Sequence, residues 1–417
     1  MIDSRWRWIL KRWMKRLWVR ATLFCVLGVV TALVATVLSP YVSYRFSKRL
    51  GSDAVESILT ILASSMLTVT VFSLSTMVSA AAAAANGATP RASRLLLEDS
   101  TAQSALSTFL GGFLFSLVGI IALNTNYYGD GARSIMFFVT LAVIGAIVAR
   151  LLQWIDYLAR LGRVGDTIDL VEKAAAGQIE NYCKDPHLGG APTTSVPEGA
   201  IPVYPESIGY VLHVDMGQLA ALTDDLNVDV FVDSRPGRFI APSRPLAWVV
   251  SSEAATDCDD VIDRARKTFT LGEDRSYEQD PRFGLIVLCE IGCRALSPAI
   301  NDSGTAIDVI GTLVRVLAPL ATPPEGDPPE IRHPRVHVPG IAMADFFEDA
   351  FLPLARDGAS RVEVGIRLQK AMGLLASLDH PEFQAAARAM AASALERSRS
   401  ELSFPEDRQR LEREAAV

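Results

Sequence analysis

The sequence has few of the residues from which metal sites and disulfide frameworks are built. Its 417 residues contain five cysteines and five histidines, and the cysteines are irregularly spaced. Cys289 and Cys293 stand four residues apart, a helical spacing that differs from the Cys-x-x-Cys of zinc and redox sites. We therefore expect reduced core thiols, no metal and no cofactor.

Enzyme signatures are missing as well. The sequence contains no recognisable Ser-His-Asp set, no glycine-rich phosphate loop and no pair of histidines at metal-binding spacing. We assign no catalytic residue on this basis, and we expect a protein that is not an enzyme.

Basic residues are scarce in the back of the chain. Residues 174–417 contain 23 Lys and Arg against 37 Asp and Glu, whereas residues 1–173 contain 17 against 10. Binding of DNA or RNA needs clustered basic side chains, so no nucleic-acid partner is expected. A basic and apolar front part instead fits a segment beside anionic lipid.

Charge is almost absent from four long apolar runs, which predict membrane spans at about residues 21–44, 57–84, 102–125 and 134–156. A helix needs about 20 apolar residues to cross a bilayer. The fourth run carries Arg150 near its end, where the long side chain can reach the interface. No Ala-x-Ala cleavage site follows the first run, so we expect a retained anchor and not a signal peptide.

The basic residues around these runs predict the orientation. Thirteen of them flank one side of the predicted spans and four flank the other. Seven of the thirteen lie in residues 1–20, a basic and Trp-rich segment suited to the membrane interface. Because basic residues stay on the cytoplasmic side, both termini are predicted to be cytoplasmic, in a protein of the cell (inner) membrane.

Two predicted spans carry stripes of small or polar residues. In the second span, Thr60, Ser64 and Thr68 share one face and Ser75 continues near it. The third span has a stripe of small residues, Ala105, Thr108, Gly112, Ser116 and Gly119. Helix packing is the favoured interpretation of both stripes. The alternative is a pore, lined by the four hydroxyl residues of the second span in a homo-oligomer.

The rest of the chain predicts a domain of mixed structure. Residues 161–206 are expected to form a juxtamembrane helix and loop, and 207–320 an α+β domain with short strands. Residues 321–340 are expected to be a Pro-rich linker with room for a short strand, and 341–417 a helical C-terminal region. The predicted fold class is a membrane protein, with an α-helical four-span transmembrane bundle followed by a cytoplasmic α+β domain with a helical C-terminal part.

The densest motif lies at residues 275–313, where two helices are predicted around a turn. Six polar residues could converge at this corner: Gln279, Asp280, Arg294, Asn301, Asp302 and Asp308. A buried polar network that holds the corner in shape is the favoured interpretation. Binding of a cation or small anion by these residues is the alternative, and catalysis at the same corner is a third.

Several segments carry a family resemblance. They are Gln279-Asp280-x-x-Phe283-Gly284, the continuation RALSPAINDSGTA at 294–306, Gly209-Tyr210-Val211, Arg235-Pro236-Gly237 and Thr89-Pro90-Arg91. In these segments the chain resembles a bacterial family of predicted membrane proteins, domain of unknown function 2254. The resemblance implies a membrane location and topology, and it implies no reaction.

Two hypotheses for function, from different classes, follow. The leading one is an oligomeric channel-like or transport-related protein with a cytoplasmic regulatory domain, because the second span is polar and the third has a small-residue stripe. The alternative is a membrane-anchored sensor or scaffold whose cytoplasmic domain binds a ligand or partner. The expected partners are the lipid bilayer and further copies of the chain, and the ligand is unknown.

Overall fold

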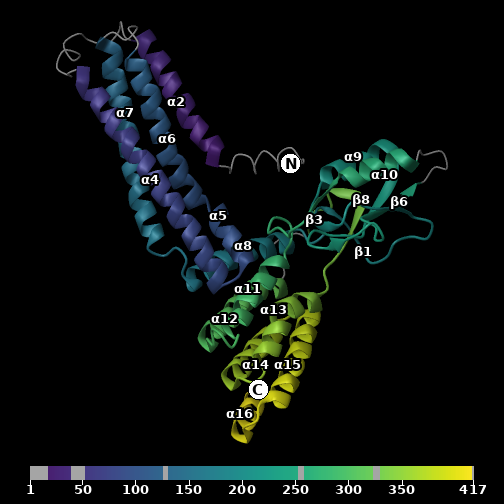
Figure 1. The fold of residues 1–417 in the computed structure, drawn as a ribbon. Helices are drawn as coiled ribbons and strands as arrows, with labels where there is room; N and C mark the ends of the chain where they lie inside the picture. The colour runs from purple at the N-terminus through teal and green to yellow at the C-terminus, as the bar shows by residue number, and fades with distance from the viewer. Residues whose placement is uncertain (1–16, 39–51, 125–129, 252–257, 323–328, 416–417) are drawn as a thin grey trace. The chain divides into compact units, whose positions relative to one another are not determined.

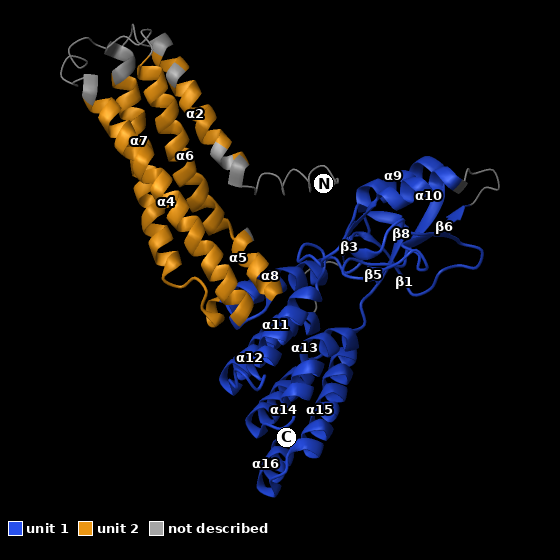
Figure 2. Ribbon diagram, in the orientation of Figure 1, with its two compact units in different colours: residues 1–5, 87–89, 167–417 blue, residues 6–86, 90–166 orange. Residues whose placement is uncertain are grey.

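The computed structural model describes residues 17–38, 52–124, 130–251, 258–322 and 329–415 (Figure 1). The chain separates into two compact units, which Figure 2 colours differently. Unit 2 comprises residues 6–86 and 90–166, and unit 1 comprises residues 1–5, 87–89 and 167–417.

Unit 2 is a bundle of apolar helices. Its long helices are α2 (Leu17–Leu38), α4 (Ser52–Gly87), α6 (Ser100–Leu123) and α7 (Asp130–Leu158), and the short α5 (Pro90–Glu98) precedes α6. Side chains from α4, α6 and α7 form its core, among them Leu59, Phe109, Phe115, Met136 and Trp154.

Three of the predicted spans are confirmed as helices long and apolar enough to cross a membrane: Ala54–Gly87, Ser100–Leu123 and Ser134–Leu158. The first predicted span falls on α2, whose apolar stretch Thr22–Ala35 is shorter. Residues 39–44 of that span lie outside the described residues, as do residues 1–16 of the predicted interfacial segment.

A fourth helix that meets the length and composition of a span is Ser303–Ala321. Its apolar side chains Val309, Ile310 and Leu313 are buried. Its exposed Arg315 makes two bonds of 2.7 Å to Glu172. Burial of one face and charge on the other are typical of a core helix in a globular domain, so we assign this helix to the core of unit 1.

The predicted stripe of small residues on α6 is buried throughout, at Ala105, Thr108, Gly112, Ser116 and Gly119. A Cβ atom placed on Gly112 would lie 2.7 Å from the side chain of Ile147, and one on Gly119 would lie 2.9 Å from Leu59. Small residues let helix backbones approach closely within a bilayer. The packing role predicted for this stripe is confirmed.

Unit 1 contains two small sheets, and helix α8 (Val164–Lys184) precedes their first strand in the chain. The five-stranded sheet has the order β1 (Gly190–Thr193), β8 (His333–Pro339), β4 (Val228–Val232), β6 (Ala247–Ser251) and β2 (Ile201–Val203). The three-stranded sheet has the order β5 (Phe239–Ile240), β3 (Gly209–Val214) and β7 (Phe269–Gly272). Helices α9 (Met216–Leu226) and α10 (Cys258–Lys267) contribute to the same core.

Alternating side chains explain the centre of the larger sheet. Val228, Val230 and Val232 of β4 are all buried, because residues two apart on a strand face the same side. Val230 lies opposite Val249 of antiparallel β6 and beside Val336 of parallel β8. Strand β8 lies within the range expected to be a Pro-rich linker.

The remainder of unit 1 is helical. Its helices are α11 (Phe283–Ala295), α12 (Ser303–Leu317), α13 (Met343–Asp357), α14 (Val362–Ala376), α15 (Pro381–Glu401) and α16 (Pro405–Ala415). Aromatic rings fill their core, with the rings of Phe347 and Phe383 packed edge to face at 4.9 Å. Apolar helices followed by a region of mixed helix and sheet confirm the coarse fold class.

Candidate functional site

The structure does not gather the six polar residues of the 279–308 motif in one place. Asp280 lies just before the first turn of α11, and Asn301 and Asp302 follow its end. A helix of 13 residues is about 20 Å long, so the two halves of the motif are separated by that length. The motif therefore supplies two different environments.

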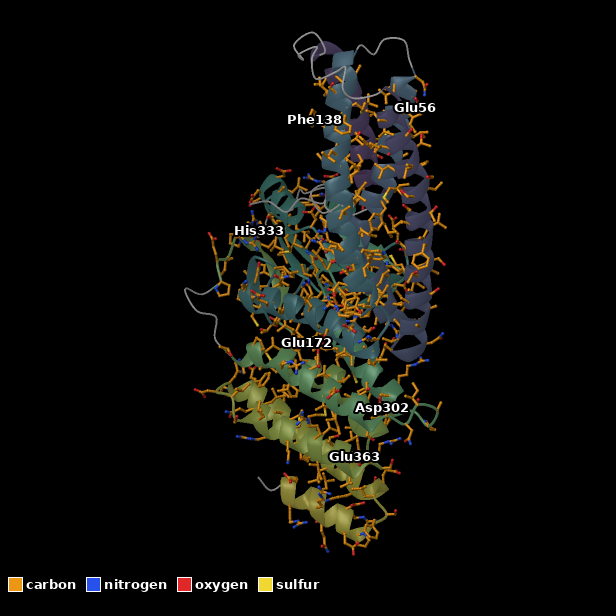
Figure 3. The ribbon with its side chains drawn as sticks, turned by 90° about the vertical axis from the view of Figure 1, so that its left-hand side faces the viewer. Glu56, Phe138, Glu172, Asp302, His333 and Glu363 are labelled. Carbon is orange, nitrogen blue, oxygen red and sulfur yellow. The ribbon has the colours of Figure 1, made fainter. Side chains whose placement is uncertain are left out.

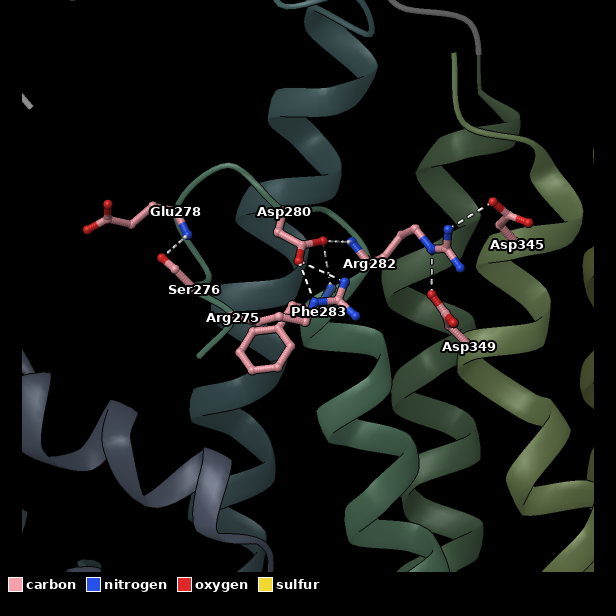
Figure 4. Close-up of polar contacts among 8 residues, drawn as sticks. All are labelled: Arg275, Ser276, Glu278, Asp280, Arg282, Phe283, Asp345 and Asp349. Carbon is pink, nitrogen blue, oxygen red and sulfur yellow. Dashed lines mark hydrogen bonds and ion pairs between the residues drawn. The ribbon is translucent and has the colours of Figure 1, made fainter. Parts of the chain in front are cut away.

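Asp280 forms the first of these environments, a buried ion pair at the start of α11 (Figure 4). Its carboxylate is 3% exposed and lies 2.7 Å from the guanidinium of Arg275. The other carboxylate oxygen accepts hydrogen bonds from the backbone N–H groups of Arg282 and Phe283 at 3.1 and 3.2 Å. Burial raises the pKa of Asp280, and the pairing with Arg275 opposes that rise. Arg275 takes the place in which Arg294 was expected.

Arg282 extends this network to the neighbouring helix. Its guanidinium donates to Asp345 at 2.8 Å and to Asp349 at 2.5 Å, both on α13 (Figure 4). Every charged group in this cluster has an oppositely charged partner. Such a saturated network fixes how α11 meets α13, which supports the structural interpretation of this half of the motif.

The second half of the motif is exposed. Asp302 caps α12, accepting from the backbone N–H of Thr305 at 3.0 Å and from its hydroxyl at 2.6 Å. These bonds lower the pKa of Asp302. Asn301 adopts a left-handed conformation with φ of 56°, and Asp308 is exposed on α12. Arg294 is half-buried, and its Nε has no hydrogen-bond partner among the described residues.

A cavity of about 540 Å³ lies beside the first half of the motif. It is lined by the end of α8, the start of α9, Arg235, the loop 278–281 and residues 330–333. Of the six predicted residues, Gln279 lines this cavity, and its side-chain oxygen accepts from the backbone N–H of Val214 at 3.1 Å. Figure 3 places His333, which also lines the cavity, well away from Asp302.

Arg235 also lines the cavity, and in the sequence it was named as part of the Arg-Pro-Gly segment but not as a site residue. Its guanidinium donates to the backbone oxygen of Pro186 at 2.8 Å and to that of Pro339, and it lies 5.6 Å from the ring centre of Tyr182. Within the described part of the chain it forms no ion pair with a carboxylate. Burial lowers the pKa of Arg235, because water no longer stabilises the charge.

The other charged groups around the cavity are paired or lie at its rim. Arg332 pairs with Asp185. Lys184 pairs with Glu180 at 2.5 Å. His213 is 4% exposed and adds an imidazole to the wall. The described residues contain no cluster of three His, Cys, Asp or Glu suited to a metal ion.

The hydroxyl residues proposed to line a pore are Thr60, Ser64, Thr68 and Ser75, and all are exposed on α4. The core side of α4 carries buried Leu59 and Met66 instead. The hydroxyls of Ser64 and Thr68 donate to backbone oxygens one turn earlier, at 3.1 and 2.9 Å. Within one chain this stripe therefore faces away from the bundle.

Comparisons with known proteins give a family and no activity. Uncharacterized proteins of Mycobacterium bovis and Mycobacterium tuberculosis are each 26% identical to the chain over 242 residues, which is 55% of this chain and 45% of each relative. The chain thus spans about half the length of the curated relatives it matches. No solved structure matches it significantly. The family described as a predicted membrane protein, DUF2254, matches residues 14–373, and since this is most of the sequence, the chain belongs to that family of membrane proteins.

Proposed function

We propose that the protein is a membrane-anchored sensor whose unit 1 binds a small polar ligand in the cavity beside α8 and α9. The observation that carries this proposal is Arg235, a half-buried cation on the cavity wall that forms no direct ion pair with a carboxylate among the described residues. A buried charge without a partner is costly, and a bound ligand would offset that cost.

The size and composition of the cavity support a small-molecule ligand. Its volume of about 540 Å³ lies within the range of roughly 300–1,000 Å³ common for such sites. Apolar Leu188 and Met216 line it together with the polar groups of Gln178 and Gln279. A mostly formed pocket with a few fixed polar groups is the usual arrangement of a binding site.

In this proposal unit 2 anchors the protein in the cell membrane and unit 1 lies in the cytoplasm. The excess of basic residues on the side of both predicted cytoplasmic termini supports this orientation. A cysteine-accessibility assay on intact cells tests it, with a single cysteine placed at Lys173. Labelling from outside by a membrane-impermeant reagent would reverse the orientation.

Ligand binding is tested on the full chain purified in detergent. A panel of anionic, cationic and neutral metabolites is screened by thermal shift and confirmed by calorimetry. Asn181→Trp places a large ring at an exposed position on the cavity wall, and Lys173→Trp places the same ring elsewhere on α8 as a control. We expect saturable binding that Asn181→Trp abolishes and Lys173→Trp preserves. Binding unaffected by both variants, or no binding at all, contradicts the proposal.

An oligomeric channel is the second candidate, and the outward hydroxyl stripe of α4 favours it. A pore lined by Thr60, Ser64, Thr68 and Ser75 requires several copies to bring these faces together around one axis. Flux of K⁺, Na⁺ and Cl⁻ into liposomes containing the pure protein tests this function. Ser64→Leu should reduce the flux, and a pure oligomer that conducts none of these ions rules the channel out.

We rank the channel below the sensor because hydroxyl groups of the α4 stripe form hydrogen bonds within their own helix. The Ser64 and Thr68 hydroxyls already donate to backbone oxygens of their own helix. Hydroxyls satisfied in this way can face lipid without a pore, because no donor is left without a partner. The guanidinium of Arg235, in contrast, donates to two backbone oxygens but forms no direct ion pair with a described carboxylate.

A further inference from the structure

We infer that the cavity of unit 1 is an anion site, in which Arg235 holds a carboxylate or phosphate group of the ligand. This inference rests on the proposed sensor function and names the chemical class of its ligand. The two groups share the same recognition chemistry, since each offers two anionic oxygens side by side to a planar guanidinium.

The first support is the charge inventory of the cavity wall. Three cations, Lys184, Arg235 and Arg332, face three carboxylates, Asp185, Glu278 and Glu330. The pairs formed by Lys184 with Glu180 and by Arg332 with Asp185 account for two of the cations. The exposed side chains of Glu278 and Glu330 lie at the rim. Among the described residues Arg235 forms no direct ion pair, although Asp185 and Asp280 lie near enough for their charges to stabilise its guanidinium.

The second support is how the guanidinium of Arg235 is held. One of its terminal nitrogens donates to the backbone oxygens of both Pro186 and Pro339. Its other N–H groups donate to no described protein acceptor. The ring of Tyr182 supports the guanidinium from one side at 5.6 Å. The cation is therefore fixed in place while part of its donor edge is left for a ligand.

The start of α9 forms another part of the cavity wall. Met216 and Gly217, the first residues of this 11-residue helix, line the cavity. The Asp215 carboxylate accepts from the backbone and the side-chain N–H groups of Gln218, at 3.0 and 2.9 Å, and so is engaged by the helix itself. The first turn of a helix carries a partial positive charge. Here the buried carboxylate of Asp215 compensates it, so the positive charge that faces the cavity near α9 comes from Arg235.

The competing interpretation is that Arg235 only braces the chain. Its two backbone acceptors, Pro186 after α8 and Pro339 at the end of β8, lie 49 and 104 residues away in sequence. A brace of this kind needs the hydrogen bonds of the guanidinium and not its net charge. The two interpretations differ in whether charge elsewhere on the wall affects binding of an anion.

The experiment titrates the full chain in detergent with inorganic phosphate and, separately, with malonate. Arg235→Gln should weaken binding of the preferred anion by about tenfold or more, because a charge-assisted hydrogen bond is lost. Lys184→Glu reverses a charge at the rim without touching the bonds of Arg235, and it should weaken binding by a few-fold. Arg264→Gln removes a partly exposed arginine that pairs with Asp225 and does not line the cavity, and it should leave binding unchanged.

The outcomes separate this inference from the sensor function. Binding of phosphate alone indicates a phosphorylated ligand, and binding of malonate alone a carboxylate. The metabolite panel could instead yield a neutral or cationic ligand whose binding is abolished by Asn181→Trp and is not displaced by phosphate or malonate. That result would support the sensor function and contradict the anion site. If Arg235→Gln fails to fold, Lys184→Glu decides, and an unchanged affinity in that variant overturns the anion site.

Discussion

The half-buried arginines at the start of α11 and the one in the adjacent cavity of unit 1 have different partners. At the start of α11, Arg282 donates to Asp345 and Asp349, and Arg275 pairs with Asp280. On the cavity wall, Arg235 has backbone oxygens and an aromatic ring, and no ion pair among the described residues. Removing one member of a direct ion pair leaves the other charge uncompensated, so the arginines at the start of α11 are tied to the fold more strongly than Arg235 is by charge.

Two helices of unit 2, α4 and α6, show a similar contrast between uncharged residues with and without partners in the bundle. The small residues of α6 are buried against neighbouring helices, for example Gly112 against Ile147. The hydroxyl residues of α4, such as Ser64, are exposed. Similar stripes in two neighbouring spans therefore have different partners. The partner of the first stripe lies within the chain, whereas the second stripe is exposed on the described surface of unit 2.

The largest effect is expected where the saturated network is broken. Asp280→Asn leaves the guanidinium of Arg275, 18% exposed, without its carboxylate. Removing one partner of a buried ion pair costs about 3–5 kcal/mol. We expect the free energy of unfolding to fall by that amount in urea titrations of the detergent-solubilised chain.

The same substitution at the exposed end of the motif is the control for Asp280→Asn. Asp302→Asn keeps an N-cap that accepts hydrogen bonds, so its effect should stay within about 0.5 kcal/mol. Equal losses from the two variants would show that burial does not distinguish the two halves of the motif.

A second test concerns the turn at Gly237, which follows Arg235 in the chain and packs against Asp280. Gly237 has a φ of 91°, and a Cβ there would collide with the carboxylate of Asp280. Gly237→Ala should therefore lose about 2–4 kcal/mol, from backbone strain and from displacement of the ion pair. Gly199→Ala is the matched control, because its φ is 80° and a Cβ would meet nothing within 4 Å.

The Gly199→Ala control measures how much of the loss in stability comes from backbone strain alone. Gly199→Ala should cost only the strain of a left-handed residue, about 1 kcal/mol. The difference between the two variants then measures how tightly the turn at Gly237 packs on Asp280. If Gly237→Ala and Gly199→Ala unfold at the same urea concentration, the contact between Gly237 and Asp280 does not contribute to stability.

Much of the fold followed from local patterns. The spans were predictable because the bilayer requires about 20 apolar residues in a row, a pattern visible within one segment. Strands β1 and β2 were not predicted. The three residues of β2 are too few to show a pattern, and they become a strand only by pairing with β6, more than 40 residues later.

The candidate site was less accessible to sequence reasoning. Asp280 was expected to meet Arg294, but the length of α11 separates them, and Arg275 five residues earlier is the partner. Arg235 was noticed in the Arg-Pro-Gly segment and not as a site residue. Its burial depends on Pro186 and Pro339, which are distant in sequence, so no local pattern distinguishes it from a surface arginine.

A third test concerns the two stripes of unit 2. A Cβ on Gly111 of α6 would overlap the side chain of Phe24 on α2, so Gly111→Leu should destabilise the bundle by about 1–3 kcal/mol. Ser64→Leu on α4 should leave the bundle of a single chain unchanged, because Ser64 is exposed. Helix content is followed while a denaturing detergent is added to mixed micelles. A bundle weakened equally by Ser64→Leu would place the α4 stripe inside the chain.

The smallest effect is expected at the cap of α12, and it depends on pH. The pKa of Asp302 is lowered by the bonds from Thr305, so the folded state binds its proton less readily than the unfolded state. Its contribution is therefore complete above the ordinary pKa of an aspartate, about 3.9, and is lost as the pH falls through the lowered value. Asp302→Ala should lose about 1 kcal/mol at neutral pH.

The control for this prediction is Asp302→Asn, which keeps the cap and removes the titration. Its stability relative to the parent chain should rise as the pH falls below about 4, because only the parent loses its charged cap there. Urea midpoints of the two proteins measured from pH 6 to pH 3 give this difference directly. A constant difference across that range would mean that Asp302 is not held in its charged form by Thr305, and that this half of the motif is free to take another partner.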